Sequence, residues 1–313
     1  MKCLSLVIPV YNEQQSIKVF IKTIDLVLNK CGYYFELIFV NDGSIDNTQN
    51  ILLLYAKNDS RIKIIELSRN FGKEYALCAG FEYASGDAVI PIDVDLQDQP
   101  ELIMDFIKYW EKGADIVVGV RSSRKSDSFF KRLSANLFYK IFRFMCGARM
   151  IQNAGDYRLL SRPALEALNS LPECVRFTKG LYAWIGFNQK IVMYERRPRE
   201  NGSTKWKSWK LWNFAIDGIT SFTTLPLRIW SYLGFVIACI GFAYAIILII
   251  RTFILGIDVP GYASIMVILL TMCGLILISL GIIGEYLGRI FEEVKKRPHY
   301  IVKSMTNIKD TSL

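Results

Sequence analysis

Three carboxylates and one amide stand within six positions in the stretch "DVDLQDQP", which follows the apolar run "AVIPI". Like charges this close repel one another, so a positive group is expected among them. Carboxylate and amide oxygens are the ligands that hard divalent cations prefer. The stretch predicts a Mg²⁺ or Mn²⁺ ion at Asp93 and Asp95, with Gln97 as a further ligand, that bridges two phosphates of a bound molecule. The alternative is an ordinary loop stabilised by a basic side chain such as Arg121.

Two other polar stretches also follow apolar runs, "YNE" after "VIPV" and "NDGS" after "FELIFV". The second is typical of a turn at a strand end, and Asp46 or Asn47 suits the cap of a following helix. Asp42 has the chemistry to accept hydrogen bonds from a base or from ribose hydroxyls. Taken alone, the stretch is equally consistent with a turn that binds nothing.

The elements that must position these residues alternate along residues 1–120. Short runs rich in Val and Ile predict strands, and longer amphipathic stretches between them predict helices. This alternation is typical of an α/β domain with a mostly parallel, Rossmann-like sheet covered on both faces. Ligands of such sheets bind at the carboxyl ends of the strands. The three polar stretches are therefore expected to face one crevice.

Composition excludes several kinds of active site. The chain of 313 residues has one histidine, His299, and seven cysteines without C-x-x-C spacing. A Ser-His-Asp or Cys-His site in the main domain and a multi-histidine zinc site are therefore excluded. Any general base must be a carboxylate, Lys or Tyr.

The C-terminal third predicts a membrane anchor. Two uncharged apolar stretches, at about 230–250 and 262–284, have the length of a membrane-spanning helix, and the short segment between them predicts a hairpin. Lys and Arg follow the second span, which places both termini in the cytoplasm by the positive-inside rule. We therefore expect a multi-pass protein of the bacterial inner membrane, with its catalytic domain on the cytoplasmic side.

Basic and aromatic residues precede this anchor. Residues 121–210 are rich in Lys and Arg, and Trp206, Trp209 and Trp212 alternate with lysines. Such a segment suits the headgroup layer of an anionic bilayer. The net charge of +9 could also attract nucleic acid, but the basic clusters adjoin the predicted spans, which favours lipid. The alternatives are a solvated basic surface and an amphipathic helix packed on the soluble domain. Glycines in both spans would allow close helix packing, which favours a homo-oligomer.

These features divide the chain into four parts. Residues 1–205 form the predicted catalytic domain, 206–228 an interfacial amphipathic region, 229–288 the two membrane helices and 289–313 a cytoplasmic tail.

The ordered motifs resemble a known family. "VIPVYNE", "VNDGSIDNT", "LSRNFGKEYALCAGFEYASGD", "DVDLQDQP", "GDYRLLSR" and "RENGSTKW" stand in the order found in the inverting family 2 glycosyltransferases of GT-A fold. The chain is most similar to the polyprenyl-phosphate sugar transferases related to dolichol-phosphate mannose synthase, and among them to the bacterial bactoprenol glucosyltransferases used in O-antigen modification. The resemblance covers nearly the whole chain.

The resemblance implies roles for particular residues. Asp93 and Asp95 would be the paired acids of the family, with Asp95 and Gln97 on the metal. The nucleotide-sugar would be bound by a second group: Pro9, Tyr11, Asn12, Glu13, Asp42, Arg69, Lys73 and Asp93. The acceptor phosphate would be bound by a third: Arg121, Arg199, Ser203 and Lys205. Arg121 and Arg199 would also take part in catalysis.

Asp156, in "GDYRLLSR", would lie near the acceptor as a candidate base. A phosphate monoester, however, has its second pKa near 6, so at neutral pH it is mostly a dianion and needs no base. Asp156 would then position Arg199 or the sugar instead. Both roles remain open.

The function implied is inverting transfer of glucose from UDP-glucose to undecaprenyl phosphate, giving a β-linked lipid-phosphate sugar. Rival donors are GDP-mannose and a UDP-aminoarabinose derivative. A processive polysaccharide synthase is disfavoured, because no Gln-x-x-Arg-Trp motif is present. A catalytically idle membrane scaffold or carrier is the alternative of another class.

Overall fold

The computed structural model describes residues 2–122, 151, 154–171, 173, 178–195, 224–255 and 261–308. The predicted phosphate-binding residues Arg199, Ser203 and Lys205, and residues 206–223 of the predicted interfacial region, lie outside these ranges.

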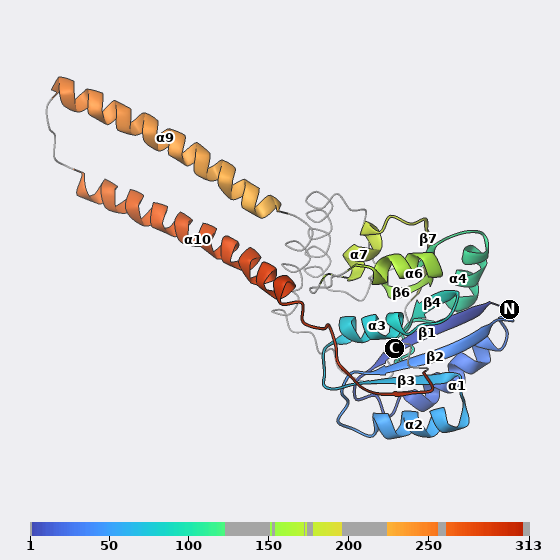
Figure 1. Cartoon of the computed structure of the whole chain (residues 1–313). Coiled ribbons are helices and arrows are strands. Elements are labelled where there is room, and N and C mark those ends of the chain that lie inside the picture. Colours follow the sequence, from blue (N-terminus) through green and yellow to red (C-terminus); the bar gives the residue numbers. More distant parts are fainter. Residues whose placement is uncertain are drawn as a thin grey trace.

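The described residues form an α/β domain and a long helical hairpin that projects from it (Figure 1). The strands are β1 Cys3–Val10, β2 Tyr34–Asn41, β3 Ile62–Leu67, β4 Ala88–Pro91, β5 Ile116–Arg121, β6 Ala154–Ser161, β7 Gln189–Tyr194 and β8 Val302–Thr306. The domain helices are α1 Ile17–Leu28, α2 Thr48–Asn58, α3 Lys73–Glu82, α4 Leu102–Glu111, α6 Arg162–Asn169 and α7 Thr178–Trp184. The hairpin helices are α9 Leu225–Leu255 and α10 Tyr262–Lys295.

The described strands form one mixed sheet in the order β7-β5-β6-β4-β1-β2-β3-β8. β4, β1, β2 and β3 run parallel, and β5 is parallel to β7. β6 is antiparallel to β4 and β5, and β8 is antiparallel to β3. The mostly parallel sheet is confirmed, whereas β6, β7 and β8 are strands that the alternation in residues 1–120 did not reveal.

The core has two layers because the central strands are buried on both faces. Apolar side chains of α1, α2 and α4 pack on one face, and those of α3, α6 and α7 pack on the other. Phe20 and Phe106 are buried in the first layer, and Phe81 and Leu165 in the second. Burial of these apolar side chains stabilises the sheet and so holds the strand ends in fixed positions.

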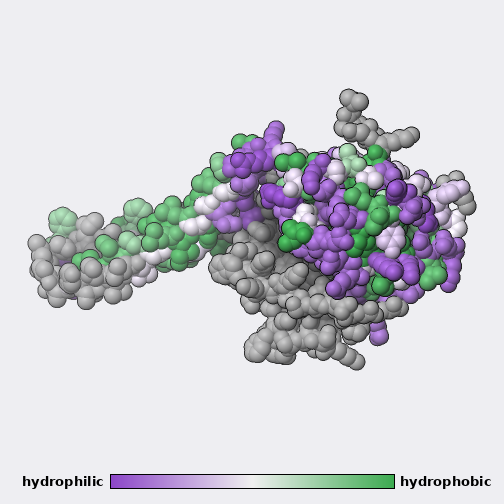
Figure 2. Space-filling view, turned by 90° about the horizontal axis from the view of Figure 1, so that it is seen from below, coloured by the Kyte–Doolittle hydropathy of each residue, from purple (hydrophilic) through white to green (hydrophobic). Residues whose placement is uncertain are grey.

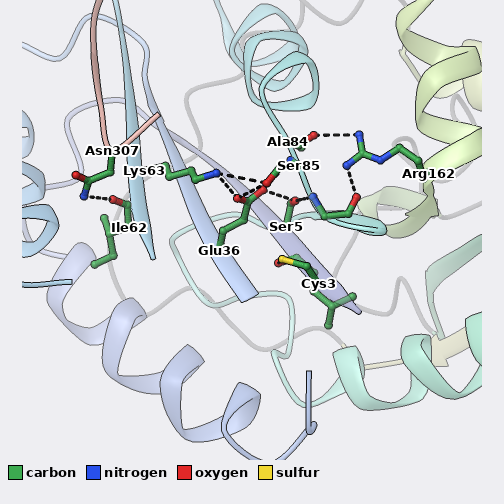
Figure 3. Close-up of polar contacts among 11 residues, drawn as sticks. Cys3, Ser5, Glu36, Ile62, Lys63, Ala84, Ser85, Arg162 and Asn307 are labelled. Atoms are coloured by element: carbon green, nitrogen blue, oxygen red, sulfur yellow. Dashed lines mark hydrogen bonds and ion pairs between the residues drawn. The ribbon is translucent and has the colours of Figure 1, made fainter. Parts of the chain in front are cut away.

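A buried polar cluster lies under the amino ends of β1, β2 and β3 (Figure 3). Glu36 of β2 forms an ion pair with Lys63 of β3 and accepts hydrogen bonds from Ser5 Oγ at 2.5 Å and from Ser85 N at 2.8 Å. Its side chain is 7% exposed. Burial raises the pKa of Glu36, but the bonds from Lys63, Ser5 and Ser85 outweigh burial and lower the pKa overall. A buried carboxylate is tolerated here because its hydrogen bonds are made.

The hairpin agrees with the two predicted spans. Within α9 and α10, the segments Leu227–Tyr244 and Thr271–Lys295 are long and apolar enough to cross a membrane. Large apolar side chains such as Phe235 and Phe253 are exposed along the hairpin. Figure 2 shows hydrophobic residues along its visible part, whereas hydrophilic residues prevail on the domain.

The chain returns to the domain after the hairpin, so the described residues 296–308 of the predicted tail contribute a strand to the sheet. α10 ends at Lys295, and β8 extends the sheet at the edge of β3. Lys303 and Ser304 both bond Glu66 of β3, at 2.6 and 2.7 Å. The strand was not predicted because "VKSMT" is polar, as is usual for an edge strand.

Candidate functional site

The centre of the site is a lysine shared by two carboxylates. Lys73 Nζ lies 2.7 Å from Asp93 Oδ1 and 3.0 Å from Asp156 Oδ2. Lys73 opens α3, Asp93 follows β4 and Asp156 is the third residue of β6. β4 and β6 are neighbours in the sheet, so the two carboxylates meet although 63 positions separate them in the sequence.

The three side chains are partly exposed, by 41% for Lys73, 29% for Asp93 and 19% for Asp156. Burial lowers the pKa of Lys73, but the charges of Asp93 and Asp156 outweigh it and raise the pKa well above its usual range. Lys73 is therefore an ammonium at any physiological pH. A basic side chain beside Asp93 was the alternative to the predicted metal ion, and Lys73 occupies that position.

A cavity opens at this cluster. Its polar lining includes Lys73, Asp93, Asp98, Arg121 and Asp156. Three of these, Asp93, Arg121 and Asp156, are predicted catalytic residues that the fold brings together from separate strand ends. The cavity therefore holds both signs of charge.

Asp95 and Gln97 follow in the turn after Asp93. The backbone N–H of Gln97 donates to Asp95 Oδ1 at 3.2 Å, and Leu96 between them has a positive φ of 54°. No group of three or more His, Cys, Asp or Glu suited to a metal exists among the described residues. Mg²⁺ and Mn²⁺ nevertheless fit this donor set, because Mg²⁺ is usually held by one or two carboxylates, with waters and substrate phosphates as its other ligands.

The predicted nucleotide loops lie beside one another at the carboxyl ends of β1 and β2. Asn12 has a positive φ of 56°. The backbone N–H of Asn12 donates to Ser44 Oγ at 3.0 Å, and the side-chain Oδ1 of Asn12 accepts from Ile45 N at 2.9 Å. Glu13 N donates to Thr48 Oγ1 at 2.9 Å. Tyr11 is 38% exposed, and Pro9 lies near the end of β1. The "YNE" and "NDGS" stretches thus form one surface.

Asp42 fixes the next loop. Its two oxygens accept the amides of Phe71, at 2.7 Å, and Gly72, at 2.9 Å. Burial raises the pKa of Asp42 more than these bonds and Arg69 lower it. A Cβ on Gly43 would lie 2.5 Å from the backbone of Arg69, so only glycine lets the two loops approach this closely. Asp42 therefore helps to set the start of α3.

Arg69 does not line the cavity with Lys73. Its guanidinium donates to the Asn70 carbonyl at 3.2 Å and lies over the Phe71 ring at 4.2 Å. Its side chain belongs to the same loop that Asp42 holds. Arg69 is linked to Lys73 through this loop and does not itself line the cavity.

Asp98 and Tyr194 are site residues that the sequence analysis missed. Tyr194 Oη donates to Asp98 Oδ1, and both residues are buried, at 4% and 5% exposed. Asp98 stands in "DVDLQDQP", so its position was a usable signal. Tyr194 ends the run "IVMY" before the basic motif, which gives no comparable signal.

Comparisons with known proteins show which proteins the chain is similar to. Residues 5–168 match the family described as Glycosyl transferase family 2, and residues 225–290 match the GtrB C-terminal hairpin. An uncharacterised glycosyltransferase of Synechocystis is 50% identical over 96% of this chain and 95% of its own. A prophage bactoprenol glucosyl transferase homolog of Escherichia coli K12 is 45% identical over 96% and 98%, and the bactoprenol glucosyl transferase of Shigella phage SfII is 46% identical over 96% and 97%.

Proposed function

The chain belongs to glycosyl transferase family 2, and from that premise we propose that it transfers glucose from UDP-glucose to undecaprenyl phosphate. The observation that carries the proposal is the match to bactoprenol glucosyl transferases along 96% of the chain, domain and hairpin together. The cavity with Lys73, Asp93, Arg121 and Asp156 is consistent with it.

The hairpin supports a lipid acceptor. The N-terminus of β1 lies at the side of the domain away from the hairpin, so β1 runs toward the hairpin and its carboxyl end lies on that side (Figure 1). A polyprenyl phosphate would keep its chain in the bilayer while its head reaches this edge of the sheet. Arg289, Lys295, Lys296 and Arg297 near the end of α10 favour a cytoplasmic domain by the positive-inside rule.

The proposed reaction is a single displacement at the anomeric carbon. The dianionic phosphate of the acceptor attacks the anomeric carbon, the bond from this carbon to the diphosphate oxygen breaks, and UDP leaves with the electron pair. Attack opposite the leaving group inverts the anomeric centre and gives a β-linked sugar phosphate. The nucleophile needs no proton removed, so Asp156, held by Lys73, would orient the reactants.

The chain's own residues would share the remaining work. Arg121 would bind phosphate oxygens in the bidentate geometry that favours arginine. Asp42 and the Tyr11–Glu13 loop would hold the nucleoside. A divalent metal, when bound at Asp95 and Gln97, would neutralise charge on the diphosphate leaving group.

Label transfer into extracted lipid tests the proposal. Membranes holding the protein, undecaprenyl phosphate and Mg²⁺ or Mn²⁺ would receive labelled UDP-glucose, with GDP-mannose and UDP-galactose in parallel. We expect label in the organic phase from UDP-glucose alone and none after addition of EDTA. Label from another donor would overturn the assignment of glucose, and no label from any donor with folded protein would overturn the proposed activity.

A further inference from the structure

We infer that Tyr194 and Asp98 are positioning residues that hold the Arg121 guanidinium at the Lys73 cavity. The inference rests on the proposed function, because it gives Arg121 an anionic ligand. It also gives a role to Asp98, the carboxylate of "DVDLQDQP" that is neither a proposed metal ligand nor an ion-pair partner of Lys73.

The backbone brings Arg121 and Tyr194 together. They are direct partners at the ends of the parallel strands β5 and β7, and Ser122 N donates to the Tyr194 carbonyl at 2.9 Å. The loop that carries Asp98 is tied to the same place, because Gln99 Nε2 donates to the Glu195 carbonyl at 2.8 Å. Three segments distant in sequence thus meet beside the cavity.

The side chains of the three residues form one polar cluster. The Tyr194 hydroxyl donates to Asp98 Oδ1, and Arg121 lies beside this pair, because it is the strand partner of Tyr194 and lines the cavity with Asp98. Burial and Asp98 raise the pKa of Tyr194 more than Arg121 lowers it, so the phenol keeps the proton that it donates. The direction of the Tyr194–Asp98 bond is fixed, because an ionised carboxylate only accepts.

Arg121 keeps donors for a ligand. Within the described residues its buried Nε has no hydrogen-bond partner, and the residue lines the cavity with Asp93 and Asp156. A long side chain that its neighbours keep in place loses less freedom when its nitrogens bind an oxyanion, which is the advantage of preorganisation. The buried negative charge of Asp98 offsets part of the cost of bringing a guanidinium out of water.

The test is a coupling measurement between Tyr194 and Arg121. Tyr194→Phe removes only the hydroxyl, and Tyr300→Phe is the matched control, because Tyr300 Oη also donates to a carboxylate, Glu82 Oε2, at 2.5 Å but lies on the C-terminal segment. Affinity for undecaprenyl phosphate would be measured in nanodiscs without donor, alongside kcat and KM for glucosyl transfer. Melting temperature would establish that each variant is folded.

We expect Y194F to weaken acceptor binding and kcat/KM about tenfold, and Y300F to change both less than twofold. In an Arg121→Ala background, Y194F should add nothing, because its effect acts through Arg121. A tenfold loss that persists in that background, or a Y194F enzyme equal to Y300F, would overturn the inference.

Two further readouts keep the test decisive. If Y194F does not fold, Asp98→Asn keeps the side-chain shape and is expected to show the same dependence on Arg121. If the wild type transfers sugar from no donor, the proposed function fails, while acceptor binding still decides whether Tyr194 acts through Arg121.

Discussion

The two ends of the central strands carry similar charges in different arrangements. Under the amino ends, Glu36 and Lys63 are 7% and 20% exposed, and Ser5 and Ser85 bond the carboxylate as well. At the carboxyl ends, Lys73 is 41% exposed and is shared by Asp93 and Asp156 at the edge of a cavity. The first cluster is closed and neutral, whereas the second has more negative charge than positive and space beside it. A buried lysine–carboxylate pair therefore does not by itself mark a site.

The largest effect should follow a change at the proposed metal ligand. Asp95→Asn removes the charged oxygens that would hold a divalent cation, so glucosyl transfer should fall by about 100-fold or more, since such an ion contributes several kcal/mol. Mn²⁺ binding in the presence of UDP, followed by electron paramagnetic resonance, should weaken in parallel. Asp105→Asn is the control, because Asp105 pairs only with the exposed Lys108 in the described contacts. Full activity in D95N would contradict the metal assignment.

The next effect concerns the shared lysine. Lys73→Met leaves Asp93 and Asp156 without their cation and should lower kcat about tenfold, a modest figure because the ammonium is partly exposed and screened by water. Lys73→Arg keeps the charge and should recover part of the rate. Equal rates for K73M and the wild type would show that the contact has no role in turnover.

The amino-end cluster should respond in stability and not in chemistry. Lys63→Met leaves the Glu36 carboxylate buried without its cation, which should cost about 3 kcal/mol of unfolding free energy. Melting temperature in detergent should fall by several degrees, while the transfer rate per folded molecule stays within twofold. A K63M protein that is as stable as the wild type but inactive would contradict a purely structural role for the amino-end cluster.

Much of this arrangement follows from the sequence, and some of it does not. β1 to β5 and the polar residues after them were predictable, because continuous apolar strands and polar strand ends are local patterns. β6 was not, since "AGDYRLLS" carries Asp156 and Arg158, whose charges are accommodated by Lys73 and by the Tyr182 ring. Tyr194 and Asp98 meet across 96 positions, and no local pattern records such a pairing.

The smallest effect is a dependence of stability on pH. The pKa of Glu36 is lowered in the folded protein, so its contribution is present above the ordinary carboxyl pKa and is lost as pH falls through the lowered value. Melting temperatures at pH 7 and below pH 4 should therefore differ less in Glu36→Gln than in the wild type. An unchanged acid dependence in E36Q would mean that other carboxylates account for it.

The most direct test of the central claim compares the two ends in one assay. Equal amounts of folded wild type, Asp156→Asn and Glu36→Gln would be given labelled UDP-glucose and undecaprenyl phosphate, and label in extracted lipid would be followed over time. We expect E36Q to transfer at the wild-type rate per folded molecule and D156N to lose about 100-fold. A D156N enzyme that transfers at the wild-type rate would contradict the claim that the carboxyl-end cluster is the site of glycosyl transfer.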